Sequence, residues 1–182
     1  MAARPPELIE RLTGYIQHNA TKDNTALRDL VQQGHDQLLG LLDGISETQA
    51  QFKPAPDVWS VLELLGHVVT AKSGVARICA RLARGETPTN RGAEGEEQDG
   101  VTRDRFASLA EARPALEAAH KELLAFIDGP LASANTDARF KHFVFGNLNC
   151  REWAAFQRVH DGDHAQQIEQ IIAAPGYPYP TG

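Results

Sequence analysis

The chain has 182 residues, of which 42% are hydrophobic, and a formal net charge of −6. This length suits one globular domain, so we expect a single domain over residues 1–182 with its bundle core between about residues 23 and 174. An acidic chain without a basic stripe does not fit a protein whose main partner is nucleic acid.

Two further features bear on the compartment. No window approaches the roughly 18 consecutive apolar residues of a membrane-spanning helix, and Pro5, Pro6 and Glu7 stand where a secretory signal would need apolar residues. Cys79 and Cys150 form no recognisable disulfide framework or CxxC motif. We therefore expect a cytoplasmic protein with no membrane partner.

Helical periodicity dominates the chain, and no segment makes a convincing sheet. The expected helices, in chain order, cover residues 6–18, 23–44, 60–84, 105–128 and 149–174. Stop signals mark their ends, such as Gly44 after the second and Pro175 after the last. The connection over residues 46–56 is expected to be non-helical, because Pro54 and Pro56 disfavour a helix before them.

The first of these helices is short, so we expect the other four to form an all-α four-helix bundle. Its later helices are separated by two long connections. Residues 86–100 are rich in glycine and acidic side chains, which is loop composition. Residues 129–147 include a weakly alternating stretch, which is expected to be a loop or a short extended segment. Connections of this length allow crossovers as well as simple up-and-down neighbours.

The last expected helix carries a polar run within its buried seam. Steps of four and three residues trace a heptad-like stripe, which is typical of a helix that faces its neighbours in a bundle. The residues of this stripe are Trp153, Gln157, His160, His164, Gln167 and Ile171. A buried polar run costs free energy unless its groups have partners. A metal ion would satisfy His160 and His164, because side chains four residues apart lie one above the other.

A third histidine, His67, follows Trp59 on the third expected helix. Ser60 has the position of the helix N-cap, and Glu63 stands at the capping-box position three residues later. Small residues follow His67 on its side of the helix and leave room beside the imidazole. Three histidine ligands with an open coordination position are the pattern of a catalytic metal site.

Together these motifs resemble the DinB superfamily, over about residues 23–173. The resemblance is carried by Trp59-Ser60, Glu63, His67, Phe145-Gly146-Asn147, Glu152-Trp153 and the run His160-Asp-Gly-Asp-His164-Ala-Gln-Gln-Ile168. Such proteins are bacterial four-helix bundles with a three-histidine metal site, related to metal-dependent thiol S-transferases and to candidate hydrolases. The resemblance implies that His67, His160 and His164 are the metal ligands.

Three polar residues near the histidines keep alternative roles. Glu63 could orient His67, accept a proton in catalysis, close the metal as a fourth ligand, or only cap its helix. Gln157 and Gln167 share the seam with the histidine pair. Each could hydrogen-bond a ligand imidazole or a substrate, or could form an ordinary interhelical hydrogen bond.

Other polar residues are expected outside the site. Asp161 and Asp163 neighbour the ligands, but on a helix they point mostly away from the seam, so we expect them to face solvent or a second subunit. His35 is expected to be a surface histidine or one with its own partner, and His120 has no partner spacing. Cys150 is expected to be a small structural residue.

The ligand set leaves the metal and the reaction open. Three histidines can bind Zn²⁺, Ni²⁺, Fe²⁺ or Mn²⁺. The ion could lower the pKa of a bound water to about 7 for hydrolysis, or bind a low-molecular-weight thiol as thiolate for transfer to an electrophile. We expect a metal-dependent transferase or hydrolase with a small-molecule substrate. The alternative is a non-catalytic metal-binding bundle that serves a stress response. The resemblance also suggests a homodimer.

Overall fold

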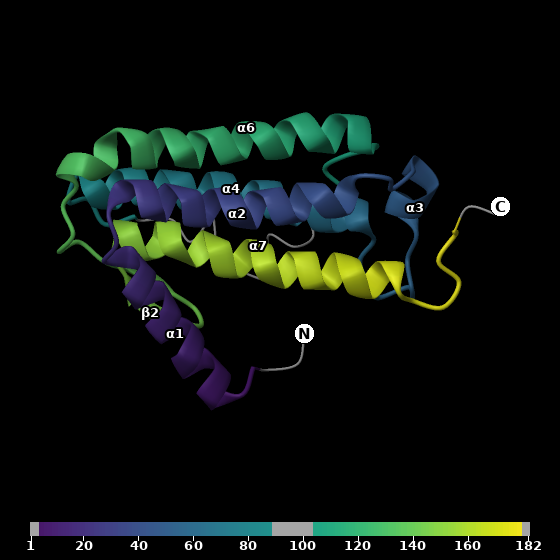
Figure 1. Cartoon of the computed structure of the whole chain (residues 1–182), viewed down its shortest axis with the longest axis horizontal. Helices are drawn as coiled ribbons and strands as arrows, with labels where there is room; N and C mark the ends of the chain where they lie inside the picture. The colour runs from purple at the N-terminus through teal and green to yellow at the C-terminus, as the bar shows by residue number, and fades with distance from the viewer. Residues whose placement is uncertain (1–3, 89–103, 180–182) are drawn as a thin grey trace.

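The computed structural model describes residues 4–88 and 104–179. Its elements are α1 (Pro6–Ala20), α2 (Asn24–Leu42), α3 (Glu47–Gln51), α4 (Val61–Ala83), α6 (Leu109–Asp128), the 3-10 helix η1 (Pro130–Ser133), β1 (Phe140–His142), β2 (Gly146–Leu148) and α7 (Cys150–Ile172). The long helices α2, α4, α6 and α7 lie side by side, and α1 projects from them against α7 (Figure 1). The expected four-helix bundle is therefore confirmed.

Helices α4 and α6 run in the same direction, each beginning at the end of the bundle that holds α3 (Figure 1). At that end the backbone N–H of Leu109 donates to the Glu47 carboxylate at 2.9 Å. At the other end the N–H of Asn135 donates to the carbonyl of Ala83 at 2.8 Å. Two parallel helices that follow each other in the chain are not simple up-and-down neighbours, so α4 and α6 use the crossover that the length of their connection allows. Most of the expected loop over residues 86–100 lies outside the described residues.

Side-chain caps fix where the helices begin. At α4 the Ser60 hydroxyl accepts from the N–H of Glu63, while the Glu63 carboxylate accepts from the N–H of Ser60. Asn149 and Glu152 form the same reciprocal pair at the start of α7. Both capping boxes satisfy backbone donors that a helix leaves without partners in its first turn, and they confirm the two starts that the sequence predicts.

Three local expectations are wrong, each for a local reason. A capping box between Ser46 and Gln49 starts α3 within the connection expected to be non-helical, and the prolines there lie beyond its end. The helix expected from residue 105 starts at Leu109, because the hydroxyl of Ser108 caps it. No sheet is expected, but the stretch expected to be a loop or a short extended segment turns back at residues 143–145 and forms a two-stranded antiparallel sheet, with Phe140 opposite Leu148.

The core of the bundle has two apolar halves. The half near the start of α7 is built from residues such as Ile16, Leu27, Val31, Leu82, Leu123, Ile127 and Trp153. The half near the end of α7 is built from residues such as Leu38, Leu42, Leu65, Val68, Leu116 and Ile168. Between them each of the four bundle helices contributes a buried polar residue to one connected group. These four residues, His35, Lys72, His120 and Asp161, are called the polar layer below.

None of the described helices combines the length and the apolar character that crossing a membrane would require.

Candidate metal centre

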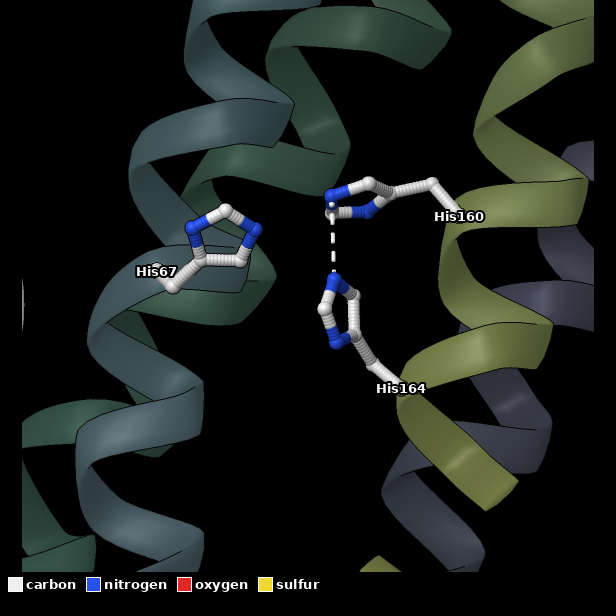
Figure 2. A group of neighbouring side chains, drawn as sticks. All are labelled: His67, His160 and His164. Atoms are coloured by element: carbon white, nitrogen blue, oxygen red, sulfur yellow. Dashed lines mark hydrogen bonds between the residues drawn. The ribbon is translucent and has the colours of Figure 1, made fainter. Parts of the chain in front are cut away.

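Three imidazoles gather at one place between α4 and α7. His67 comes from α4, and His160 and His164 come from successive turns of α7; all three point toward a common centre (Figure 2). One ring nitrogen from each lies within 4.8 Å of the other two. The structure thus brings together all three ligands that the resemblance implies, and this group could hold a metal ion.

The spacing of the nitrogens fits coordination of a single ion. The Nε2 atoms of His160 and His164 are 3.1 Å apart. Two imidazole nitrogens bound to one tetrahedral Zn²⁺ at about 2.05 Å would be about 3.3 Å apart. A shared ion would take the place of the hydrogen bond that now joins these two nitrogens, so the donor set suits a divalent transition metal.

Burial keeps two of the three imidazoles neutral. Burial, and then the charge of His160, lowers the pKa of His67 to about 4. Burial again is the main cause of a pKa well below the usual range at His164. Only a neutral imidazole offers a lone pair to a metal, so near neutral pH both side chains are ready to act as ligands.

Two glutamine amides lie against the outer nitrogens of the α7 pair. The Oε1 atom of Gln167 is 2.8 Å from Nδ1 of His164, and a proton on Nδ1 leaves the Nε2 lone pair directed inward. The Nε2 atom of Gln157 is 3.3 Å from Nδ1 of His160. Both glutamines thus lie beside the histidines, as one of their alternative roles requires.

The carboxylate of Glu63 already accepts hydrogen bonds at the start of α4. Besides its part in the capping box, its Oε1 atom accepts from Nζ of Lys53 at 3.0 Å. Among the described residues, the group that could hold a metal consists of the three histidines and does not include Glu63. The capping role is therefore observed, and a role in catalysis stays a prediction.

Aromatic rings flank the imidazoles on two sides. The ring of Trp59 lies 5.5 Å from His67, and that of Phe156 lies 5.6 Å from His160. Beyond Phe156 comes His142, from the hairpin β1–β2, at 4.5 Å. Its Nδ1 atom accepts from the N–H groups of Val144 and Phe145, which fixes the ring at the hairpin turn. The hairpin therefore supports one wall of the site.

The structure overturns the expectation for Asp161, which is fully buried and faces the bundle interior. Its Oδ2 atom accepts from Nζ of Lys72 at 2.8 Å, and both side chains have no exposed surface. Burial alone would raise the pKa of this carboxyl, but the charges of Lys72 and His160 hold it well below its usual range. Asp163 differs, because it remains about a third exposed and pairs with Arg4.

Lys72 was missed by sequence reasoning, although a signal existed. It lies seven residues after Leu65 and four after Val68, on the apolar side of α4. A lysine at such a position is almost never buried without a partner of opposite charge. A search for an acidic residue on a core-facing stripe would have found Asp161, four residues before Ala165 and seven before Ile168.

The polar layer continues from Lys72 toward the far side of the bundle. Nζ of Lys72 is 3.4 Å from Nδ1 of His35, whose Nε2 is 3.4 Å from the Glu117 carboxylate. His35 stacks on His120 with 3.8 Å between ring centroids, and Nε2 of His120 is 3.0 Å from Oε1 of Gln32. His35 thus has partners of its own, as expected, and it does not join the three-histidine group.

The two cysteines lie away from the imidazoles. Both are buried free thiols. The thiol of Cys79 donates to the carbonyl of Cys150 at 3.3 Å, and that of Cys150 to the carbonyl of Asn135 at 3.5 Å. Burial is the main reason why the pKa of each thiol is raised, so these positions match small structural residues.

Comparisons with known proteins agree with this architecture. Residues 30–168 match the profile of the DinB superfamily. The chain is similar in fold to the crystal structure of TT2238, a four-helix bundle protein, with a TM-score of 0.58 and 21% identity, over 81% of this chain and 98% of the other. No curated protein matches the chain in sequence. Since the profile spans most of the bundle and both histidine-bearing helices, the chain belongs to the DinB superfamily.

Proposed function

We propose that the protein is a metal-dependent enzyme whose centre activates a small nucleophile, either water or a low-molecular-weight thiol. The observation that carries this proposal is the donor set. Among the described residues, three histidines gather and no acidic or thiol side chain completes the group. Structural metal sites are closed by four protein ligands, whereas catalytic sites keep a position open for substrate.

A divalent ion bound here would supply Lewis acidity, which lowers the pKa of a water or thiol at its open position. The other contributions come from the chain. Gln167 holds the imidazole of His164 with its lone pair inward. The rings of Trp59 and Phe156 lie against His67 and His160 and limit how far these imidazoles can turn. Of Zn²⁺, Ni²⁺, Fe²⁺ and Mn²⁺, any could serve, because geometry and availability select among them.

The first experiment is metal analysis of protein purified without chelators or a metal-binding tag. About one divalent ion per chain is expected from a single three-ligand site. The double variant His160→Ala/His164→Ala should lose that ion, while His18→Ala, which removes an exposed histidine of α1, should keep it. Unchanged metal content in the double variant would refute the assignment.

A second experiment separates the two reactions. Metal-loaded protein is screened with ester and amide substrates, and separately with cellular thiols plus an electrophile. Turnover that needs the thiol and is lost in His67→Ala identifies a transferase. Hydrolysis without thiol, lost in the same variant, identifies a hydrolase. A full metal complement without turnover in either screen favours the non-catalytic stress-response bundle.

We also propose a homodimer, although its interface is not defined by the contacts within one chain. Helix α1 packs on α7 and leaves Tyr15 39% exposed, so apolar surface remains for a second copy. Light scattering at micromolar concentration should give twice the mass of one chain, and a monomer would contradict the proposal.

A further inference from the structure

Asp161 is held from two sides and faces His160 on a third. Its Oδ2 atom accepts from Lys72 at 2.8 Å, and its Oδ1 atom accepts from Nε2 of Gln157 at 2.7 Å. The same Oδ1 atom lies 3.9 Å from Nδ1 of His160. The carboxylate, the ammonium and the amide are all fully buried, so the arrangement is fixed by the bundle rather than by solvent.

A buried ion pair needs a reason in such a core. Removing two charges from water costs several kcal/mol per ion, and apolar side chains of similar size often serve stability equally well or better. The apolar halves on both sides show that this bundle can fill its interior with leucine, isoleucine and valine. The pair is therefore poorly explained by stability alone.

The ring orientation of His160 supplies that reason. Its Nε2 atom faces His164 and the centre of the site, so a metal bound there leaves the proton on Nδ1. That proton needs an acceptor. Gln157 cannot provide one without turning its amide, because the group that it directs at Nδ1, 3.3 Å away, is its NH₂ group, which also donates to the carboxylate.

We propose that Asp161 is the positioning residue for His160, accepting its Nδ1–H when Nε2 binds the metal, and that Lys72 fixes and compensates this carboxylate from the opposite side. A small rotation of the imidazole would shorten 3.9 Å to a hydrogen bond of about 2.8 Å. This inference rests on the proposed metal centre. It assigns Lys72 and Asp161 a role in metal affinity, which is separate from any role in folding.

The test replaces both charges at once, with Lys72→Met/Asp161→Leu. Removing the pair together leaves no unpaired buried charge, so the melting temperature of the metal-free variant should match or exceed that of the native chain. Its affinity for Zn²⁺, measured by competition with a chromophoric chelator, should fall about 10- to 100-fold, as expected when the outer partner of a ligating histidine is lost. Equal affinity would overturn the inference.

Two further variants separate positioning from general disturbance of the core. In Lys72→Met/Asp161→Asn the amide oxygen of the new side chain can still accept from Nδ1, so part of the lost Zn²⁺ affinity should return. His120→Phe is the matched control, since it changes a buried residue of the same polar layer that contacts none of the three ligands. Its Zn²⁺ affinity should stay within about threefold of the native value. If His120→Phe loses as much Zn²⁺ affinity as Lys72→Met/Asp161→Leu, the inference is also contradicted.

A measurement on the native chain covers the case in which these variants fail to fold. Nitrogen-15 NMR of the histidine rings in Zn²⁺-loaded protein should show His160 protonated on Nδ1, with slow exchange of that proton. A proton that exchanges freely, or a metal on Nδ1, would overturn the inference. Absence of Zn²⁺ binding by the native chain would instead refute the proposed metal centre itself, so the two failures are distinguishable.

Discussion

The apolar halves of the bundle and the polar layer between them are stabilised in different ways. Each half is filled with leucine, isoleucine, valine and alanine from all four helices, whose contribution is burial of apolar surface and close packing. The polar layer holds two histidines, a lysine and an aspartate with specific partners. Side chains in the halves can be exchanged for others of similar volume, whereas each member of the layer depends on a particular neighbour.

The layer also lies beside the candidate metal centre. Asp161 directly follows His160 on α7, and Lys72 lies five residues, a little more than one turn, after His67 on α4. The polar layer and the three imidazoles therefore occupy adjoining levels of the bundle. This arrangement suggests that the layer is retained for the site, and that the halves supply the stability that allows it.

Breaking the layer on one side only should have the largest effect on stability. In Asp161→Leu the ammonium of Lys72 would stay buried without its carboxylate, which typically costs about 3–5 kcal/mol. Urea unfolding of the metal-free protein would measure the change. The double variant Lys72→Met/Asp161→Leu should recover this loss in full, because it leaves no unpaired buried charge. Equal stability of the single variant and the native chain would show that Lys72 reaches water or another partner.

A cavity in an apolar half should cost somewhat less and leave the site intact. Leu116 of α6 is fully buried among the residues near α3, so Leu116→Ala should lower the free energy of unfolding by about 2–5 kcal/mol. Its affinity for Zn²⁺ should match that of the native chain, because α6 supplies none of the three imidazoles. A clear loss of metal affinity would mean that packing in the halves also shapes the site.

Removal of the metal should have a smaller effect still. The bundle buries a large apolar core without any ion, unlike zinc fingers, which need theirs to fold. Chelation should therefore preserve the helical circular dichroism signal. It should cost about 2.7 kcal/mol of stability relative to protein with free metal at 100 times its dissociation constant. Loss of the helical signal would instead indicate a structural ion.

The contrast between halves and layer also explains how far the sequence could predict the molecule. Periodicity and caps act within one helix, so the starts of α4 and α7 follow from Ser60 and Asn149. The pairing of His160 with His164 is also local, since the two are one turn apart. By contrast, α3 is not predicted. The prolines in its connection argue against a helix, but they lie after its end and do not affect the capping box that starts it.

The polar layer could not be predicted in the same way. The burial of Asp161 depends on Lys72, which is 89 residues away in the chain, and the stacking of His35 on His120 depends on how α2 meets α6. The position of Asp161 around the axis of α7, taken alone, predicts that its side chain faces solvent. This prediction failed because α7 is surrounded by α1, α2 and α4, so that a position off the main seam still faces the interior.

The smallest expected effect is a dependence of the free energy of unfolding on pH that arises from His120 in the polar layer. Burial, followed by the charges of His35 and Lys72, lowers the pKa of His120 from 6.5 to about 3. The folded state then binds fewer protons than the unfolded state between these values. The contribution of neutral His120 to the free energy of unfolding is therefore fully present above about pH 6.5 and is lost as the pH falls toward 3.

Urea unfolding of metal-free protein at pH 7 and pH 5 would measure this term. His120 should account for a loss of about 1–2 kcal/mol on acidification, and His120→Phe should remove that part of the loss. The matched control is His18→Gln, which replaces an exposed histidine of α1. If His120→Phe behaves like the control, the folded protein must bind a proton at His120 as readily as the unfolded chain does. The layer would then be more hydrated than its burial indicates, and His35, stacked on the same ring, would be the next histidine to replace.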